Sequence, residues 1–324
     1  MTVVAVTGIS GHVGRGLLPL LEQDPAVERI IGIDLVPPAW GGAKVVFHRA
    51  DVRDEGIAAL FQGADVVIHL AFILFLKPGQ PDDWPDDVNI RGSQNVVQAA
   101  AQAGVRRLIT LSSVLAYGGR PDNPIPIQET HPLRGRLDFF YSRAKVMLER
   151  FLARFAREHP EMTITILRAC GVMGPQADPN RMAGYTTRPF FAIRNGPPMQ
   201  MVHEEDVATA IHLAIRRDLP GAYNLAPDDW VKVADVIRAI GWPVLELPYG
   251  LVRLLTALAY RTGHSLIHPK MLDELRYPII LSNARLRAQG WAPRYSSQET
   301  FYAGLLLPRW GKQRVVGEAG AASH

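Results

Sequence analysis

The chain has 324 residues, of which 48% are apolar and 20% are charged, the balance of an ordinary globular protein. Its net charge of +4 is spread over scattered arginines, and no basic run alternates with aromatic residues, so we expect no nucleic-acid partner. The single cysteine, Cys170, excludes an internal disulfide and suits a reducing compartment. The N-terminus has no signal-peptide pattern and no apolar stretch is long enough to span a bilayer, so we expect a cytoplasmic protein without a transmembrane segment.

Short runs rich in valine and isoleucine alternate with amphipathic segments over the first two-thirds of the chain. We predict helices at 13–23, 89–104 and 141–159, and buried strands at 3–8, 29–35, 44–48, 65–71, 107–113 and 163–169. Strand alternating with helix at this spacing predicts an α/β fold, a Rossmann-type doubly wound parallel sheet with helices on both faces.

The composition of the chain changes after residue 170, where proline and glycine cluster and the helical patterns become shorter. We therefore expect a Rossmann-type domain over 1–170, and a helix–strand pair at 206–226 that returns to it. A smaller, mainly helical C-terminal lobe is expected over 171–205 and 227–310. Residues 311–324 are small and polar, which is typical of a disordered tail.

Three glycines follow the first predicted strand. The stretch TGISGHVG places Gly8, Gly11 and Gly14 between that strand and the helix after it. Glycines here let the diphosphate of a dinucleotide approach the helix N-terminus, where free N–H groups and the helix dipole favour an anion. Because the strand and the helix are both present, we predict a dinucleotide-binding loop.

Asp34 ends the second predicted strand. A carboxylate at this place can accept hydrogen bonds from the adenosine ribose hydroxyls and repels a 2′-phosphate, which favours NAD over NADP. The alternative is a solvated acid at a strand end. His12 and Arg15 lie close to the glycine loop and keep NADP open as the less favoured cofactor.

The spacing T-G-x-x-G-x-x-G resembles the short-chain dehydrogenases/reductases, and more specifically their extended branch, the NAD-dependent epimerase/dehydratase family. The stretches HRADVRD, VVIHLAF, LRACGVMGP and MVHEEDVATAI resemble further segments of that family in the same order. The resemblance implies that the domain over 1–170 binds NAD(P) and that the smaller lobe binds substrate. The resemblance implies an NAD(P)-dependent enzyme whose cofactor contacts are Gly8, Ile9, Gly11, His12, Val13, Gly14, Asp34, Leu35, Asp51, Val52, Leu70, Ala71, Phe72, Asn89, Leu111, Tyr141, Lys145, Cys170 and Val172.

Two motifs resemble the catalytic segments of the same family. LSSVLAYGG is similar to S-S-x-x-x-Y-G, which implies a reactive hydroxyl at Ser113, and YSRAK supplies Tyr141 and Lys145. Residues four apart on a helix share a face, so the last two can point into one cleft. A free tyrosine titrates near pH 10, and we expect the lysine ammonium and a positive nicotinamide ring to lower the pKa of Tyr141. Tyr141 is then the acid/base of a hydride transfer, and Ser113 orients the substrate oxygen.

Other polar groups have simpler interpretations, and we expect no metal site. Asn89 resembles an asparagine that some relatives use in a proton relay, but a helix N-cap or a structural role is an equal alternative. The acidic stretch 82–87 reads as a proline-broken loop before a helix, and HEED at 203–206 as the cap of a helix that begins near Val207. Cys170 is expected to pack beside the cofactor as a small hydrophobe.

The substrate is less clearly indicated. Relatives that act on nucleotide sugars usually carry asparagine in L-R-x-x-N, and Gly171 stands there in this chain. Apolar segments at 72–76 and 247–260 flank the expected cleft, and the C-terminal region resembles 3β-hydroxysteroid dehydrogenase-like members. A hydrophobic ketone or secondary alcohol, steroid-like or 3-oxoacyl-like, is therefore the favoured small-molecule substrate, although plain core packing also explains both segments.

Two alternatives stay open. A nucleotide-sugar epimerase with tightly bound NAD could bind phosphates with Arg181, Arg188 and Arg194. Dehydration is disfavoured, because Val114 and Leu115 stand where the dehydratases of the family typically have Asp-Glu. A non-catalytic NAD(P)-sensing regulator ranks third, because such proteins often lose the tyrosine or the lysine. The family resemblance also implies a possible homodimer through helices around 87–103 and 140–158.

Overall fold

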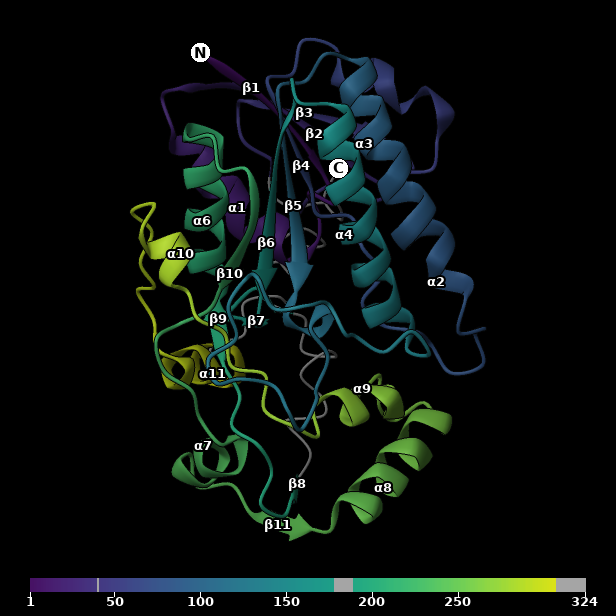
Figure 1. The fold of residues 1–324 in the computed structure, drawn as a ribbon, viewed down its shortest axis with the longest axis vertical. Coiled ribbons are helices and arrows are strands. Elements are labelled where there is room, and N and C mark those ends of the chain that lie inside the picture. The colour runs from purple at the N-terminus through teal and green to yellow at the C-terminus, as the bar shows by residue number, and fades with distance from the viewer. Residues whose placement is uncertain (40, 178–188, 307–324) are drawn as a thin grey trace, which may run out of the picture.

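The protein is described by a computed structural model over residues 1–39, 41–177 and 189–306 (Figure 1). Within these residues seven parallel strands form the central sheet, in the spatial order β10-β6-β5-β4-β1-β2-β3. The predicted Rossmann-type sheet is thereby confirmed. Its strands are β1 (Thr2–Thr7), β2 (Val27–Asp34), β3 (Val45–Arg49), β4 (Val66–His69), β5 (Arg107–Ser113), β6 (Thr163–Ala169) and β10 (Gly221–Leu225).

Helices cover both faces of this sheet (Figure 1). On one face lie α1 (His12–Gln23) and α6 (Glu204–Arg216), and on the other lie α3 (Ser93–Gln102) and α4 (Phe140–Glu158). Successive side chains of a strand point to opposite faces: Val4 and Val6 join the core under α1 and α6, and Ala5 joins the core under α3 and α4. Two buried faces explain why the central strands are almost wholly apolar.

A smaller group of elements lies beyond the ends to which the strand arrows point (Figure 1). Two short parallel pairs, β7 with β9 and β8 with β11, stand apart from the main sheet. Their bounds are β7 (Gly171–Met173), β8 (Phe190–Ile193), β9 (Met201–His203) and β11 (Val244–Leu247). The helices here are α7 (Val233–Ala239), α8 (Tyr249–Arg261), α9 (Pro269–Glu274) and α11 (Ser297–Leu306). The short α10 (Ala284–Arg287) lies instead beside β10, at the edge of the main sheet (Figure 1).

The remaining described helices are short. They are the 3₁₀ helices η1 (Glu55–Phe61) and η3 (Val114–Ala116), the short α2 (Trp84–Asp86), and the π-helical η2 (Asp87–Gly92) that leads into α3. No helix in the described ranges is long and apolar enough to cross a membrane. The expected tail at 311–324 and two of the candidate phosphate-binding arginines, Arg181 and Arg188, lie outside the described residues.

One predicted helix start and one predicted loop were wrong. The helix expected near Val207 begins at Glu204, because the His203 ring accepts a hydrogen bond from the Glu205 amide and three acids fill the first turn, where the helix dipole favours them. The acidic loop expected at 82–87 is helical from Trp84, because Pro85 sits in the first turn, where its missing N–H costs nothing.

Asp24 links the helices of one face. Asp24 is the C-cap residue of α1. Its carboxylate accepts hydrogen bonds from His212 Nε2 at 2.6 Å and Arg216 Nη2 at 2.5 Å, both on α6. Burial alone raises the pKa of Asp24, but the hydrogen bonds from His212, the Ala26 amide and Arg216 outweigh it and lower the pKa to about 2. A carboxyl whose folded pKa lies below its unfolded value stabilises the protein above that unfolded value, and the contribution is lost as the pH falls towards 2.

Replacement of Asp24 by asparagine is therefore expected to lower the free energy of unfolding by about 2 kcal/mol at pH 7 and by clearly less at pH 3. Urea unfolding followed by circular dichroism at both pH values measures the difference. The exposed Asp83→Asn variant is the control, with an expected change below about 0.5 kcal/mol. An equal loss for Asp24→Asn at both pH values would contradict the assignment.

Candidate active site

A cavity of about 340 Å³ lies at the carboxyl ends of the parallel strands, where β1 and β4 adjoin and the strand order reverses. This is the place where open α/β sheets bind their ligands. The cavity brings together most of the residues that the sequence singled out: Gly8, Gly11, His12, Val13, Gly14, Leu70, Ala71, Phe72, Leu111, Ser113, Tyr141, Lys145, Cys170 and Val172. Ile9, Asp34, Leu35, Asp51, Val52 and Asn89 do not line it.

The glycine loop has the geometry that a dinucleotide requires. Gly8 has a φ of +75°, and a Cβ built there would lie 2.4 Å from the Ala71 nitrogen. A Cβ on Gly14 would lie 2.4 Å from the Ile9 carbonyl oxygen. Only glycine fits either position, and the bare backbone opens directly onto the N-terminus of α1, so the loop fits a bound diphosphate.

Asp34 lies at the end of β2, beside the loop. Its carboxylate accepts hydrogen bonds from the amides of Ser10 at 3.0 Å and Leu35 at 2.8 Å. His12 Nε2 lies 2.6 Å from Glu204, and Arg15 donates to the carbonyl oxygens of Ser10 and Gln176. The position of the Asp34 carboxylate beside the glycine loop fits a cofactor ribose bound next to it.

Two of the expected contacts lie near the edge of the site. Asp51 is paired with Arg53 at 2.7 Å, which lowers the pKa of the carboxyl. Asn89 is fully buried within η2, so the N-cap alternative was wrong. Its amide bonds both the N–H and the C=O of Ile73, at 2.7 and 2.9 Å. Asn89 therefore fixes the backbone that follows β4, which is a structural role.

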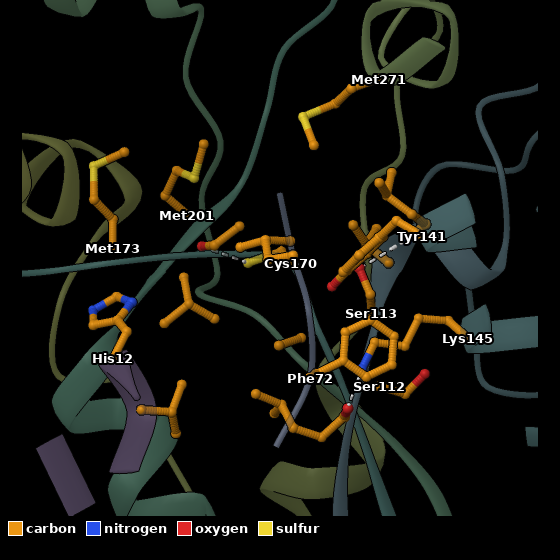
Figure 2. Close-up of a pocket in the computed structure, with 18 of the residues that line it drawn as sticks. His12, Phe72, Ser112, Ser113, Tyr141, Lys145, Cys170, Met173, Met201 and Met271 are labelled. Atoms are coloured by element: carbon orange, nitrogen blue, oxygen red, sulfur yellow. Dashed lines mark hydrogen bonds between the residues drawn. The ribbon is translucent and has the colours of Figure 1, made fainter. Parts of the chain in front are cut away.

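The three candidate catalytic side chains come from two elements. Ser113 ends β5 and accepts a hydrogen bond from the Leu115 amide at 3.2 Å. Tyr141 and Lys145 stand one turn apart near the start of α4, and Figure 2 shows the Tyr141 and Ser113 hydroxyls close together in the cavity. The buried Lys145 Nζ donates to the Leu111 carbonyl oxygen at 2.8 Å and lies 3.5 Å from the centre of the Phe72 ring.

The pKa of Tyr141 is raised, not lowered as expected. Burial raises it, and the interaction with the Ser113 side chain opposes this only in part. Lys145 does not supply the expected effect, because its Nζ turns to Leu111 and lies 5.7 Å from the centre of the Tyr141 ring. Burial also lowers the pKa of Lys145 itself to about 7, although Glu149 raises it. The tyrosine is thus a neutral proton donor at neutral pH.

A buried histidine beside this pair was not identified from the sequence. His69, at the end of β4, bonds Thr7 Oγ1 at 2.7 Å and Ser93 Oγ at 2.8 Å. Burial first, and Lys145 second, lower the pKa of His69 to about 3, so it is neutral. The only sequence signal was a polar residue within an apolar strand.

The far wall of the cavity is built from the C-terminal part of the chain and is mostly apolar. None of these residues was predicted individually, and only Met173 and Met201 belong to segments that resemble family motifs. They are Met173, Met199, Met201, Met271, Leu275, Tyr277 and Ile279. Figure 2 shows Met173, Met201 and Met271 around the cavity. Methionine adapts to irregular apolar shapes, so this wall suits an apolar ligand.

Gly171 is constrained by this wall. A Cβ there would lie 2.2 Å from the Met201 sulfur, so an asparagine does not fit without rearrangement. Arg194 is exposed at the end of β8 and does not line the cavity. Cys170 is buried beside Gly171, and burial raises the pKa of its thiol. Among the described residues, no group of three or more His, Cys, Asp or Glu is placed to hold a metal ion.

A model of the NAD-dependent epimerase/dehydratase family matches residues 4–226. The chain belongs to this family. A 3 beta-hydroxysteroid dehydrogenase/Delta 5→4-isomerase of Mycobacterium tuberculosis is 32% identical to this chain, over 91% of this chain and 87% of that protein. An uncharacterized protein of the same organism is 25% identical, over 92% of this chain and 82% of its own length.

Solved structures of the family have the same fold. The Thermus thermophilus UDP-glucose 4-epimerase, in complex with NAD, has a TM-score of 0.73 and 25% identity, covering 94% of this chain and 98% of its own. The Thermotoga maritima UDP-glucose 4-epimerase, with UDP-glucose, has a TM-score of 0.74 and 21% identity, covering 97% of this chain and all of its own. The fold of this chain is thus that of these two epimerases.

Proposed function

We propose that the protein is an NAD-dependent oxidoreductase that interconverts an apolar secondary alcohol and its ketone. The observation that carries this proposal is the meeting of Ser113, Tyr141 and Lys145 at the end of a cavity whose opposite wall is apolar. The 32% identity to a 3 beta-hydroxysteroid dehydrogenase/isomerase supports the same substrate class.

NAD, when bound, supplies the hydride donor or acceptor. In the direction of ketone reduction, the Tyr141 hydroxyl gives its proton to the substrate oxygen, and Ser113 donates a hydrogen bond to the same oxygen as negative charge develops on it. In the reverse direction, the Tyr141 phenolate takes the proton of the alcohol. Lys145, as an ammonium, would hold the nicotinamide ribose when the cofactor is bound. The raised pKa keeps Tyr141 protonated near neutral pH, which is the form that gives a proton in ketone reduction.

Replacement of Tyr141 by phenylalanine is expected to lower kcat/KM at least about 100-fold, because the proton donor is lost, with NADH affinity unchanged within about twofold. The substrate is first found by a screen of sterols, medium-chain 3-hydroxy compounds and UDP-sugars with NAD⁺, followed by the absorbance of the reduced cofactor.

Full activity of Tyr141→Phe on the substrate found would contradict the mechanism. UDP-sugars also need product analysis, because an epimerase returns its hydride without net reduction. Epimerised sugar would replace the proposal with the epimerase alternative, and tight NADH binding without any turnover would favour the sensor.

The cofactor preference is assigned to Asp34. Replacement of Asp34 by alanine removes the charge that opposes a 2′-phosphate, so the ratio of the Kd for NADPH to that for NADH is expected to fall at least about tenfold. Fluorescence titration of the reduced cofactors measures both constants. Asp83→Asn, an exposed acid on another segment, is the control. An unchanged ratio in Asp34→Ala would contradict the assignment.

We also propose a homodimer that buries the outer surfaces of α3 and α4. Met147 on α4 is 42% exposed, so its side chain is available to pack against a partner subunit. Replacement of Met147 by arginine is expected to give a monomer in light scattering after size exclusion. A monomeric wild-type protein, or a dimeric Met147→Arg variant, would contradict this interface.

A further inference from the structure

A buried carboxylate stands behind the catalytic pair. Glu149 follows Tyr141 and Lys145 on the same face of α4, since the three residues are four apart. Its side chain is 3% exposed and pairs with Arg168 of β6, whose Nη2 and Nε lie 2.7 and 2.9 Å from Oε2.

Lys145 and Glu149 contact consecutive residues of β5. The Lys145 ammonium donates to the carbonyl oxygen of Leu111 at 2.8 Å, and Glu149 Oε1 accepts a hydrogen bond from Ser112 Oγ at 2.5 Å. Ser112 directly precedes Ser113. The same carboxylate therefore lies one helical turn from the lysine and holds the strand end that carries the catalytic serine.

Arg168 is itself held from outside the helix. Its Nη1 donates to the Tyr117 hydroxyl at 2.7 Å and to the Glu129 carbonyl oxygen at 2.9 Å, and the Tyr117 hydroxyl donates to Asn224 at 2.8 Å. A buried ion pair of this kind is often no more stabilising than apolar side chains of the same volume. Stability alone therefore does not account for an ion pair at this place.

We propose that Glu149, fixed by Arg168 and Ser112, is a positioning residue that keeps Lys145 charged and holds Ser113 in place for the reaction. The proposal rests on the proposed function only for the reaction itself. The link between Glu149 and Lys145 rests on their positions one turn apart on α4 and on their hydrogen bonds with consecutive residues of β5.

Among the titratable groups around Lys145, Glu149 is the one that favours the charged form of the lysine. His69 of β4 is neutral near pH 7, because burial lowers its pKa to about 3. Tyr141 is neutral as well, because burial raises its pKa. Burial lowers the pKa of Lys145 to about 7, and Glu149 is the group that raises it. Arg168 lies on the far side of Glu149 and orients it.

The test follows the protonation of Lys145 directly. The protein has six lysines, so labelling with [ε-¹³C]lysine gives few NMR signals, and Lys145→Met assigns the one of interest. In wild-type protein the Lys145 signal is expected to titrate near pH 7. In Glu149→Gln its midpoint is expected to fall by about one pH unit. Glu158→Gln, an exposed carboxylate on the same helix, is the matched control with no shift expected.

A second variant covers the case in which Glu149→Gln does not fold because Arg168 is left unpaired. The double change Glu149→Leu with Arg168→Met removes both charges, is expected to fold, and should lower the same midpoint. An unchanged Lys145 midpoint in the folded variants would overturn the proposal.

Activity provides an independent readout once a substrate is known. Glu149→Gln is expected to lose about tenfold in turnover at pH 8 and to recover most of it at pH 6, because one unit in a titration midpoint is a factor of ten in the charged fraction. A lowered midpoint with no pH-dependent loss would leave the link to Lys145 intact and contradict the role of Lys145 in catalysis. A failure of the link between Glu149 and Lys145 is thus distinguishable from a failure of the proposed catalytic role of Lys145.

Discussion

The site depends on one buried ammonium group. Lys145 lies between the sheet and α4 with 4% of its surface exposed, and water cannot compensate its charge. Among the described residues, it donates a hydrogen bond to the Leu111 carbonyl oxygen, and its Nζ lies 3.5 Å from the centre of the Phe72 ring. A cation in such a place is costly for folding, and the cost is reflected in the lowered pKa. Groups perturbed in this way, in a cavity, mark functional sites.

The surroundings of Lys145 divide into two parts with opposite character. On the sheet side, polar side chains fix the backbone: Asn89 holds the segment after β4, and Glu149 holds the end of β5. On the side of the C-terminal part, methionines and other apolar residues form a wall with few fixed hydrogen-bond donors. The first part is suited to hold a reacting oxygen rigidly, and the second is suited to accommodate an apolar body of varied shape.

Much of the fold and of the glycine loop could be predicted from the sequence, because each motif reflects a local steric or hydrogen-bonding requirement. Gly8 and Gly14 were recognised because only glycine allows the close backbone approach now measured. The strands were recognised because burial on both faces requires apolar runs. The start of α6 was missed because a histidine ring, rather than a typical capping side chain, accepts the hydrogen bond there.

The rest depends on contacts between distant segments. Glu149 and Arg168 are charged residues in ordinary helix and strand positions, and only the packing of α4 on β6 pairs them. The rise in the pKa of Tyr141 depends on burial, which four-residue spacing cannot reveal. Most of the apolar wall comes from segments without motifs, which converge only in the fold.

The central claim, hydride transfer at a carbon that bears oxygen, is tested most directly by isotope transfer. The ketone found by screening is reduced with NADH that carries deuterium at the transferable position, and the alcohol is analysed by mass spectrometry and NMR. One deuterium on the carbinol carbon is the predicted result. An alcohol without deuterium at that carbon, formed by the same protein with the same cofactor, would contradict the account.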